Sequence, residues 1–125
     1  MFALGLPAVL AYADSWRGNK ENRNTVAVIV TLDGKIITGV NKEGVYNKDV
    51  QDVLDFNGRP NEFNRQCAEV NAVSKALNQG YDLTFAVILV VKVGGINSLE
   101  HGFTKPPCNV CKRLLSYYAV IYRPI

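Results

Sequence analysis

The sequence predicts an α/β protein in which helices cover both faces of a mixed sheet, giving three layers, α-β-α. β-Branched runs over 25–30 and 36–40 flank Asp33-Gly34, a pair that is typical of a two-residue hairpin turn. The almost continuous apolar run over 83–93 is typical of a central strand buried on both faces. Because helical patterns lie on either side of that run, we expect a right-handed crossover between parallel strands.

The chain of 125 residues is long enough for one hydrophobic core and too short for two, so we expect a single domain over 1–125. Residues 42–66 show no clear hydrophobic period, and a loop of this length usually carries function. This stretch contains one short helical turn over 50–56. The expected parts are an N-terminal helix over 1–14, the β-hairpin over 25–41, this functional loop region over 42–66 and an αβαβ core over 67–125.

The composition excludes several classes of protein. Hydrophobic residues make up 48% of the chain and charged residues 20%, which is ordinary for a globular domain and excludes disordered and collagen-like chains. The net charge of +3 permits a polyanionic partner without requiring one. No apolar run approaches the roughly 20 residues that span a bilayer, and no basic residue precedes the first apolar stretch. We therefore expect no signal peptide, no transmembrane segment and no membrane partner, and action in the cytoplasm by a domain taken from a longer chain.

The three cysteines are an odd number, which argues against a disulfide framework. Cys108 and Cys111 have C-x-x-C spacing and open a helix directly after two prolines, so both sulfurs can face one point. Cys67 opens another helix, and helices that follow loops in a layered sheet can begin at the same edge. Three sulfurs at two helix N-termini would then lie within reach of one ion. Three protein ligands with an open fourth position are typical of catalytic zinc, since structural zinc normally has four.

Glu69 lies two residues after Cys67, about 200° around an ideal helix. The two side chains can therefore converge only on a site beyond the helix end, near its axis. A carboxylate at such a site can take a proton from water and pass it to a leaving group. Two alternatives stay open. A redox pair at Cys108 and Cys111 leaves Cys67 unused, and a structural zinc site needs His101 or another fourth ligand.

The stretches CAE at 67–69 and PPCNVC at 106–111 resemble the zinc signature of the cytidine deaminase-like superfamily. The double proline is most similar to bacterial polymorphic-toxin deaminases of the YwqJ-like type, and the resemblance covers residues 25–122. It implies the cytidine deaminase-like fold and hydrolytic deamination at C4 of cytosine, or at C6 of adenine. By position, it implies a Zn²⁺ site with these members: the ligands Cys67, Cys108 and Cys111, the proton carrier Glu69, and the nucleotide contacts Asn41 and Ala68.

The sequence departs from this family in two ways. Many polynucleotide deaminases have histidine as the first ligand, whereas Cys67 makes this site entirely thiolate. The resulting negative charge should make bound water less acidic, and the two helix dipoles with Arg65 and Lys105 would offset it. In addition, many relatives carry a fifth strand, which we expect to be absent here or supplied elsewhere.

Aromatic and cationic residues around the predicted site favour a polymeric substrate, because such enzymes stack the target base and contact the phosphate backbone. We predict that the protein deaminates cytosine in nucleic acid, with single-stranded DNA as the favoured substrate. We also predict a toxin-type domain, which an immunity protein would bind. RNA, free cytidine or a nucleotide, and a structural-zinc binding module stay open as alternatives. The candidate substrate contacts are the aromatic-ring residues Tyr46, Phe56, Phe63, His101 and Phe103 and the cations Lys42, Lys48, Arg59, Arg65 and Lys105.

Overall fold

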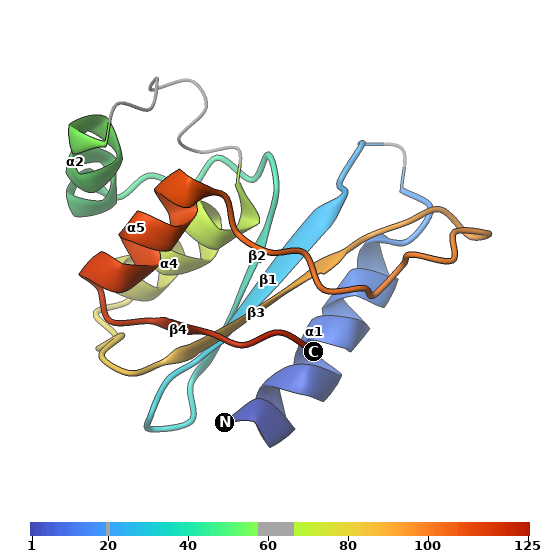
Figure 1. Cartoon of the computed structure of the whole chain (residues 1–125), viewed down its shortest axis with the longest axis horizontal. Coiled ribbons are helices and arrows are strands. Elements are labelled where there is room, and N and C mark those ends of the chain that lie inside the picture. The colour runs from blue at the N-terminus through green and yellow to red at the C-terminus, as the bar shows by residue number, and fades with distance from the viewer. Residues whose placement is uncertain (20, 58–66) are drawn as a thin grey trace.

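The computed structural model describes residues 1–19, 21–57 and 67–125, which form one mixed sheet with helices on both faces (Figure 1). The elements are α1 (Phe2–Trp16), β1 (Thr25–Val30), β2 (Ile36–Val40), α2 (Lys48–Phe56), α4 (Ala68–Asn78), β3 (Val87–Lys92), α5 (Asn109–Tyr117) and β4 (Ile121–Tyr122). The strand order is β2-β1-β3-β4, in which β1 is antiparallel to both its neighbours and β3 is parallel to β4. The predicted α/β class and mixed sheet are confirmed.

The two central strands contribute side chains to two hydrophobic clusters, one on each face of the sheet. On β1, Val26 and Val28 pack in the cluster that contains α1 residues, whereas Ala27 and Ile29 pack in the cluster that contains α4 residues. Strand β3 alternates in the same way, as the apolar run over 83–93 predicts for a strand buried on both faces. Helix α1 therefore covers one face, and α2, α4 and α5 cover the other (Figure 1).

The β1–β2 turn is longer than the predicted two-residue turn. The Thr31 N–H donates to the Lys35 carbonyl at 2.9 Å, and the Gly34 N–H donates to the Thr31 carbonyl at 3.0 Å. Three residues therefore form the loop, and Gly34 closes it at φ +87°, in the left-handed region that this loop length needs at its last position. The Thr31 hydroxyl also donates to the Asp33 carboxylate. Asp33-Gly34 therefore indicates the hairpin correctly but not the number of residues in its loop.

The region predicted as a loop over 42–66 contains a full helix, α2, where the sequence indicated one turn. The Asn47 side chain caps it by accepting a hydrogen bond from the Val50 N–H at 3.1 Å. Val50 and Leu54, one turn apart, are both buried, so packing extends the helix beyond its local pattern.

Among the described helices, none has the length and apolar character needed to cross a membrane.

Helix α4 ends just before a glycine. Gly80 follows it at φ +77°, and its N–H donates to the Leu77 carbonyl at 2.9 Å. The Tyr81 N–H donates to the Ala76 carbonyl at 3.0 Å, which completes a Schellman motif.

Close packing between α4 and β2 depends on Gly39. A Cβ atom at this residue would lie 2.4 Å from the Ala68 carbonyl oxygen and 2.6 Å from the Ala72 nitrogen. Both are backbone atoms of the helix, so they cannot move without moving the helix. The missing side chain at Gly39 therefore brings the first turn of α4 against the sheet.

Candidate active site

The N-termini of α4 and α5 bring the three cysteines to one place. Cys67 is the N-cap of α4 and Cys108 is the N-cap of α5, and neither side chain makes a capping hydrogen bond. Both line a cavity of about 460 Å³. Cys111, in the first turn of α5, is fully buried. None of the three is in a disulfide.

The thiol of Cys111 contacts the other two cysteines. Hydrogen bonding with Cys108, then with Cys67, and then burial raise the pKa of the Cys111 thiol above its usual range, and the nearby Glu69 carboxylate adds to the effect. Anionic sulfur is thus disfavoured in this cluster while no cation compensates it. A bound divalent cation reverses that preference, because metal binding displaces the thiol protons.

The chemistry of these donors fits zinc, which takes thiolate ligands readily. Among the described residues, no group of three or more histidine, cysteine, aspartate or glutamate side chains already has a metal-binding arrangement. The three thiols are in hydrogen-bonding contact through Cys111 rather than arranged as a ligand set.

Glu69 lies in the first turn of α4 and is only 6% exposed, yet it lines the same cavity as Cys67 and Ala68. A cavity in front of the helix N-terminus is where two side chains separated by 200° can meet, as expected from the spacing. The positive end of the helix dipole favours the ionised carboxylate there. Glu69 is therefore placed to hold and release a proton inside a partly enclosed site.

The opposite wall of the cavity comes from the ends of β1 and β2. The Asn41 side-chain oxygen accepts hydrogen bonds from the backbone N–H groups of Asn24 and Thr25, at 2.8 and 3.1 Å. The Lys105 ammonium donates to the Thr25 hydroxyl at 2.8 Å. Asn41 and Lys105 both line the cavity, so two of the predicted substrate contacts also hold its wall in shape.

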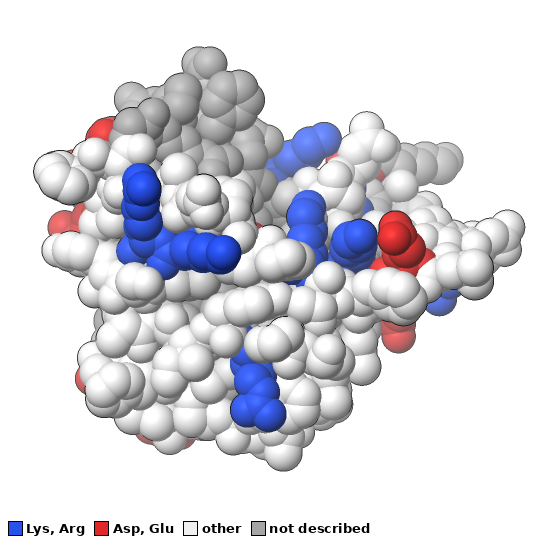
Figure 2. Space-filling model, in the orientation of Figure 1, with Lys and Arg blue, Asp and Glu red and all other residues white. Residues whose placement is uncertain are grey.

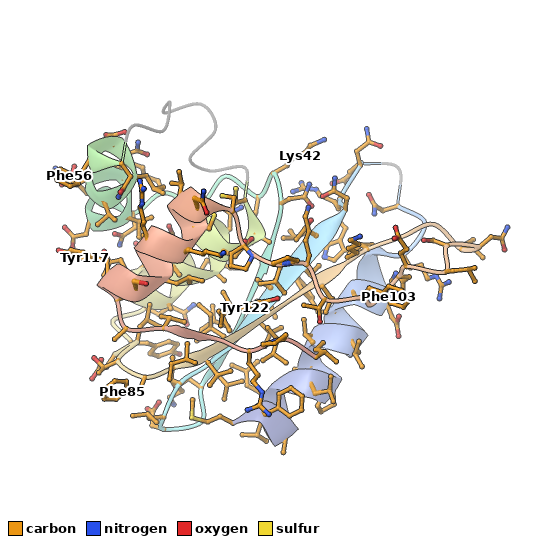
Figure 3. The ribbon with its side chains drawn as sticks, viewed as in Figure 1. Lys42, Phe56, Phe85, Phe103, Tyr117 and Tyr122 are labelled. Carbon is orange, nitrogen blue, oxygen red and sulfur yellow. The ribbon has the colours of Figure 1, made fainter. Side chains whose placement is uncertain are left out.

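His101 and Phe103 do not line this cavity. The Gly94 N–H donates to Nδ1 of His101 at 3.0 Å, which leaves the proton on Nε2, and this nitrogen donates to the Asp14 carboxylate at 2.7 Å. His101 thus ties the segment after β3 to α1 and is not placed as a fourth metal ligand. Phe103 is 56% exposed, in the segment before α5 (Figure 3).

Of the other described candidates, Lys42 lines the cavity, whereas Tyr46, Phe56 and Lys48 lie in other parts of the molecule. Tyr46 lines a small hollow between α2 and α4, and Phe56, which is 92% exposed, lines an open groove between α2 and α5. Figure 3 shows Phe56 at the end of α2, far from Phe103. Lys48 pairs with Asp52 on the surface of α2 at 3.0 Å. Arg59, Phe63 and Arg65 lie outside the described residues.

Sequence reasoning missed Asn71, which is fully buried one turn after Cys67. Its side-chain NH₂ donates to the Val40 carbonyl at 2.9 Å, and its side-chain oxygen accepts from the Val45 N–H at 2.9 Å. Asn71 thereby fixes the segment that carries Asn41 against the helix that carries Glu69. An amide within the apolar face of AEVNAV was the available signal.

The comparisons with known proteins agree with this geometry. The family model of the cytidine and deoxycytidylate deaminase zinc-binding region matches residues 6–123. A search of curated proteins finds no match.

Solved structures of cytidine deaminases are similar to this chain. The one from Mycobacterium leprae has 19% identity and a TM-score of 0.58, over 94% of this chain and 79% of the other. A glutamate-to-glutamine mutant from Mycobacterium tuberculosis has 15% identity and a TM-score of 0.60, over 98% and 84%. The one from Burkholderia pseudomallei has 23% identity and a TM-score of 0.53, over 88% and 71%. At these identities the likeness shows a shared fold.

Proposed function

The chain belongs to the cytidine and deoxycytidylate deaminase family and is a zinc-dependent hydrolytic deaminase, and from that premise we propose that its substrate is cytosine in single-stranded nucleic acid, with single-stranded DNA as the first candidate. One observation carries the proposal. The cavity that holds Cys67, Cys108 and Glu69 also has Lys42 and Lys105 in its wall, so an acidic reaction centre opens between two cations. Such a site suits a base attached to phosphates.

Cys67, Cys108 and Cys111 would hold Zn²⁺, which when bound supplies the activated water. Glu69 accepts a proton from that water and delivers it to N3 of the cytosine ring. Cytosine and one water molecule are converted to uracil and ammonia, which leaves from C4. Ala68 is 1% exposed and its small side chain leaves space for the ring, as the resemblance to the superfamily implies.

The charge of the site needs compensation. Zinc with three thiolates is net negative, and Glu69 adds a further negative charge. The N-termini of α4 and α5 both face this cluster, and Lys105 lies in the wall of the same cavity. These positive potentials would lower the cost of keeping the Glu69 carboxylate and the thiolates ionised together.

Free cytidine is the second candidate, favoured by the names of the structurally similar enzymes. A toxin-type role with an immunity partner rests on the resemblance of the double proline before Cys108. Expression in a sensitive cell tests it: the wild-type chain is expected to arrest growth and raise C-to-T changes, whereas Glu69→Gln is not. Equal arrest by both would reject the role.

A substrate panel with metal analysis tests the proposed reaction. Wild type is expected to convert cytosine to uracil faster in single-stranded DNA than in RNA, duplex DNA or free deoxycytidine. Glu69→Gln should keep zinc and lose at least about 10²-fold in turnover, the usual contribution of general acid–base catalysis. Cys108→Ser should lose zinc and activity together.

The matched control is Asp52→Asn, which removes an exposed carboxylate that pairs with Lys48 at 3.0 Å on α2, outside the cavity. It should leave turnover unchanged. If Glu69→Gln retained both zinc and full activity, Glu69 would not be the proton carrier. Zinc binding without turnover of any substrate by wild type would favour the structural-zinc module.

A further inference from the structure

A second hollow adjoins the cavity of the candidate active site. It measures about 480 Å³ and is formed by the α1–β1 connector, the turn after β2 and the segment after β3. The two hollows share Asn24 and Lys42 in their linings. A third and smaller hollow, of about 200 Å³, shares Asn24 and Lys105 with the active-site cavity. A substrate that fills the active-site cavity therefore has two adjoining spaces into which it can extend, one beside each lysine.

The charges around these hollows are unequal. Three carboxylates nearby already pair with a cation: Glu21 with Arg23 at 3.2 Å, Glu43 with Lys75 at 2.7 Å and Glu100 with Lys92 at 3.6 Å. For Lys42 and Lys105, no ion pair is recorded among the residues that the structure describes. Figure 2 shows Lys and Arg side chains across this face, with one acidic patch beside them and the other acidic side chains toward its edges. Lys42 thus leaves positive charge without an ion-pair partner among the described residues, beside the active-site cavity.

The backbone at Lys42 is held in an unusual conformation. Its φ of +65° lies in the left-handed region, which is uncommon for a residue other than glycine. Neighbours on both sides fix it, because the Asn41 side chain bonds to the start of β1 and Glu43 pairs with Lys75 on α4. Figure 3 shows Lys42 projecting from the turn after β2. Such strain persists only where the surrounding contacts impose it, and it is frequent at ligand sites.

We infer that the second hollow is a phosphate subsite, in which Lys42 binds the phosphate attached to the target nucleotide and the hollow accepts the neighbouring nucleotide. This inference rests on the proposed function. The ligand chemistry is a phosphate ester, which either single-stranded DNA or a free nucleotide can supply. A single lysine contact to a phosphate adds affinity and salt dependence without sequence preference.

Lys42→Asn tests the subsite, because asparagine tolerates the left-handed backbone while it removes the charge. The zinc-loaded enzyme is assayed on deoxycytidine, on dCMP and on a nine-nucleotide single strand with one central cytosine. We expect kcat/KM to fall about tenfold for at least one phosphate-bearing substrate, and to fall less for deoxycytidine. The salt slope for the nine-nucleotide strand should become smaller by about 0.7. Lys42→Arg should restore most of the loss.

Lys35→Asn is the matched control, since Lys35 lies at the other end of the same hairpin, with its ammonium 6.0 Å from the centre of the Tyr81 ring. It should change no substrate preference. A fall for dCMP as well as for the strand assigns the 5′ phosphate of the target nucleotide to Lys42, and a fall for the strand alone assigns the phosphate on its 3′ side. An equal fall for deoxycytidine, or no fall for any substrate, would overturn the subsite.

Failure of the proposed function would give a different result. If the strand is not deaminated but dCMP is, the polymer is the wrong substrate while the dCMP comparison still tests Lys42. If no substrate is deaminated, the fluorescence anisotropy of a labelled oligothymidylate, which contains no cytosine, measures binding by the two variants instead. Weaker binding by Lys42→Asn than by Lys35→Asn supports the subsite, and equal binding rejects it.

Discussion

Helices α4 and α5 both begin at a cysteine beside the same cavity, but they are held in very different ways. Eight of the eleven residues of α4 are buried, against three of the nine residues of α5. Contacts therefore surround α4 on most sides, whereas α5 packs along a single stripe. On its other side α5 borders an open groove of about 780 Å³ that it shares with α2.

This difference separates two roles within one site. The helix with the fixed position carries Glu69, whose proton transfer needs accurate placement. The helix with the looser packing carries Cys108 and Cys111, two of the three proposed ligands, which can adjust when an ion binds. If the comparison is correct, changes beneath α4 should harm the protein much more than similar changes on α5.

Gly39→Ala should have the largest effect. The new Cβ would meet the backbone of α4 at 2.4 and 2.6 Å, so the helix must move away from β2. We expect a loss of about 3 kcal/mol in the free energy of unfolding, measured by urea denaturation, and a loss of turnover from the surviving folded fraction. Gly95→Ala is the control, because its added Cβ meets nothing within 4 Å. Equal midpoints for the two variants would refute the close packing of α4.

Asn71→Ala should have an intermediate effect. It leaves the Val40 carbonyl and the Val45 N–H without their side-chain partner in a buried region, at a cost of about 2 kcal/mol. The wall that carries Asn41 should then loosen, which raises KM more than it lowers kcat. Asn109→Ala makes the same change at an exposed position in the first turn of α5 and should cost less than about 0.5 kcal/mol. The comparison between the helices fails if both variants lose the same stability.

Tyr118→Phe, directly after α5, should have the smallest effect at neutral pH. The Tyr118 hydroxyl is buried and has no hydrogen-bond partner among the described residues, so its removal should change stability by less than about 0.5 kcal/mol. Burial, with a smaller effect from Asp49, raises the pKa of Tyr118 to about 12 from an ordinary value of 10.0.

That pKa predicts an alkaline effect. The unfolded chain loses the Tyr118 proton above pH 10, while the folded chain keeps it until about pH 12. Stability from this group is therefore complete below pH 10 and declines as the pH rises toward 12. Urea titrations at pH 9 and pH 11 should show a smaller alkaline loss in Tyr118→Phe than in wild type. Identical losses would mean that Tyr118 titrates as an exposed tyrosine.

The sequence predicted the sheet and the cysteine cluster for a shared reason, since both depend on local patterns. The run over 83–93 is typical of a strand buried on both faces and contains β3, and the caps at Cys67 and Cys108 follow from the starts of two helices. The predicted hairpin loop was one residue shorter than the observed loop, because a left-handed residue at Gly34 fits more than one loop length. The predicted length of helix α2 was too short, because burial of Val50 and Leu54 comes from tertiary contacts.

The substrate contacts were harder to predict, because they depend on where loops meet in space. His101 is near Cys108 in the sequence, yet its ring bonds to Gly94 and to Asp14 of α1. Lys42 was one of several cations in a long loop, and it is distinguished only by its place in the linings of two hollows together with its left-handed backbone. Asn71 was visible as a polar residue on an apolar face, but its two partners lie about 30 positions earlier in the chain.

The three-residue loop of the β1–β2 hairpin is a suitable place to attach a label or a fused module to this enzyme. It lies at the opposite end of the hairpin from Asn41 and Thr25, which belong to the active-site wall. Leu32 in this loop is 63% exposed, and the space beside Gly34 is empty within 4 Å. Exposed loop tips of this kind accept inserted sequence well. A fluorophore or a fused targeting module attached there would be carried at a distance from the catalytic cavity.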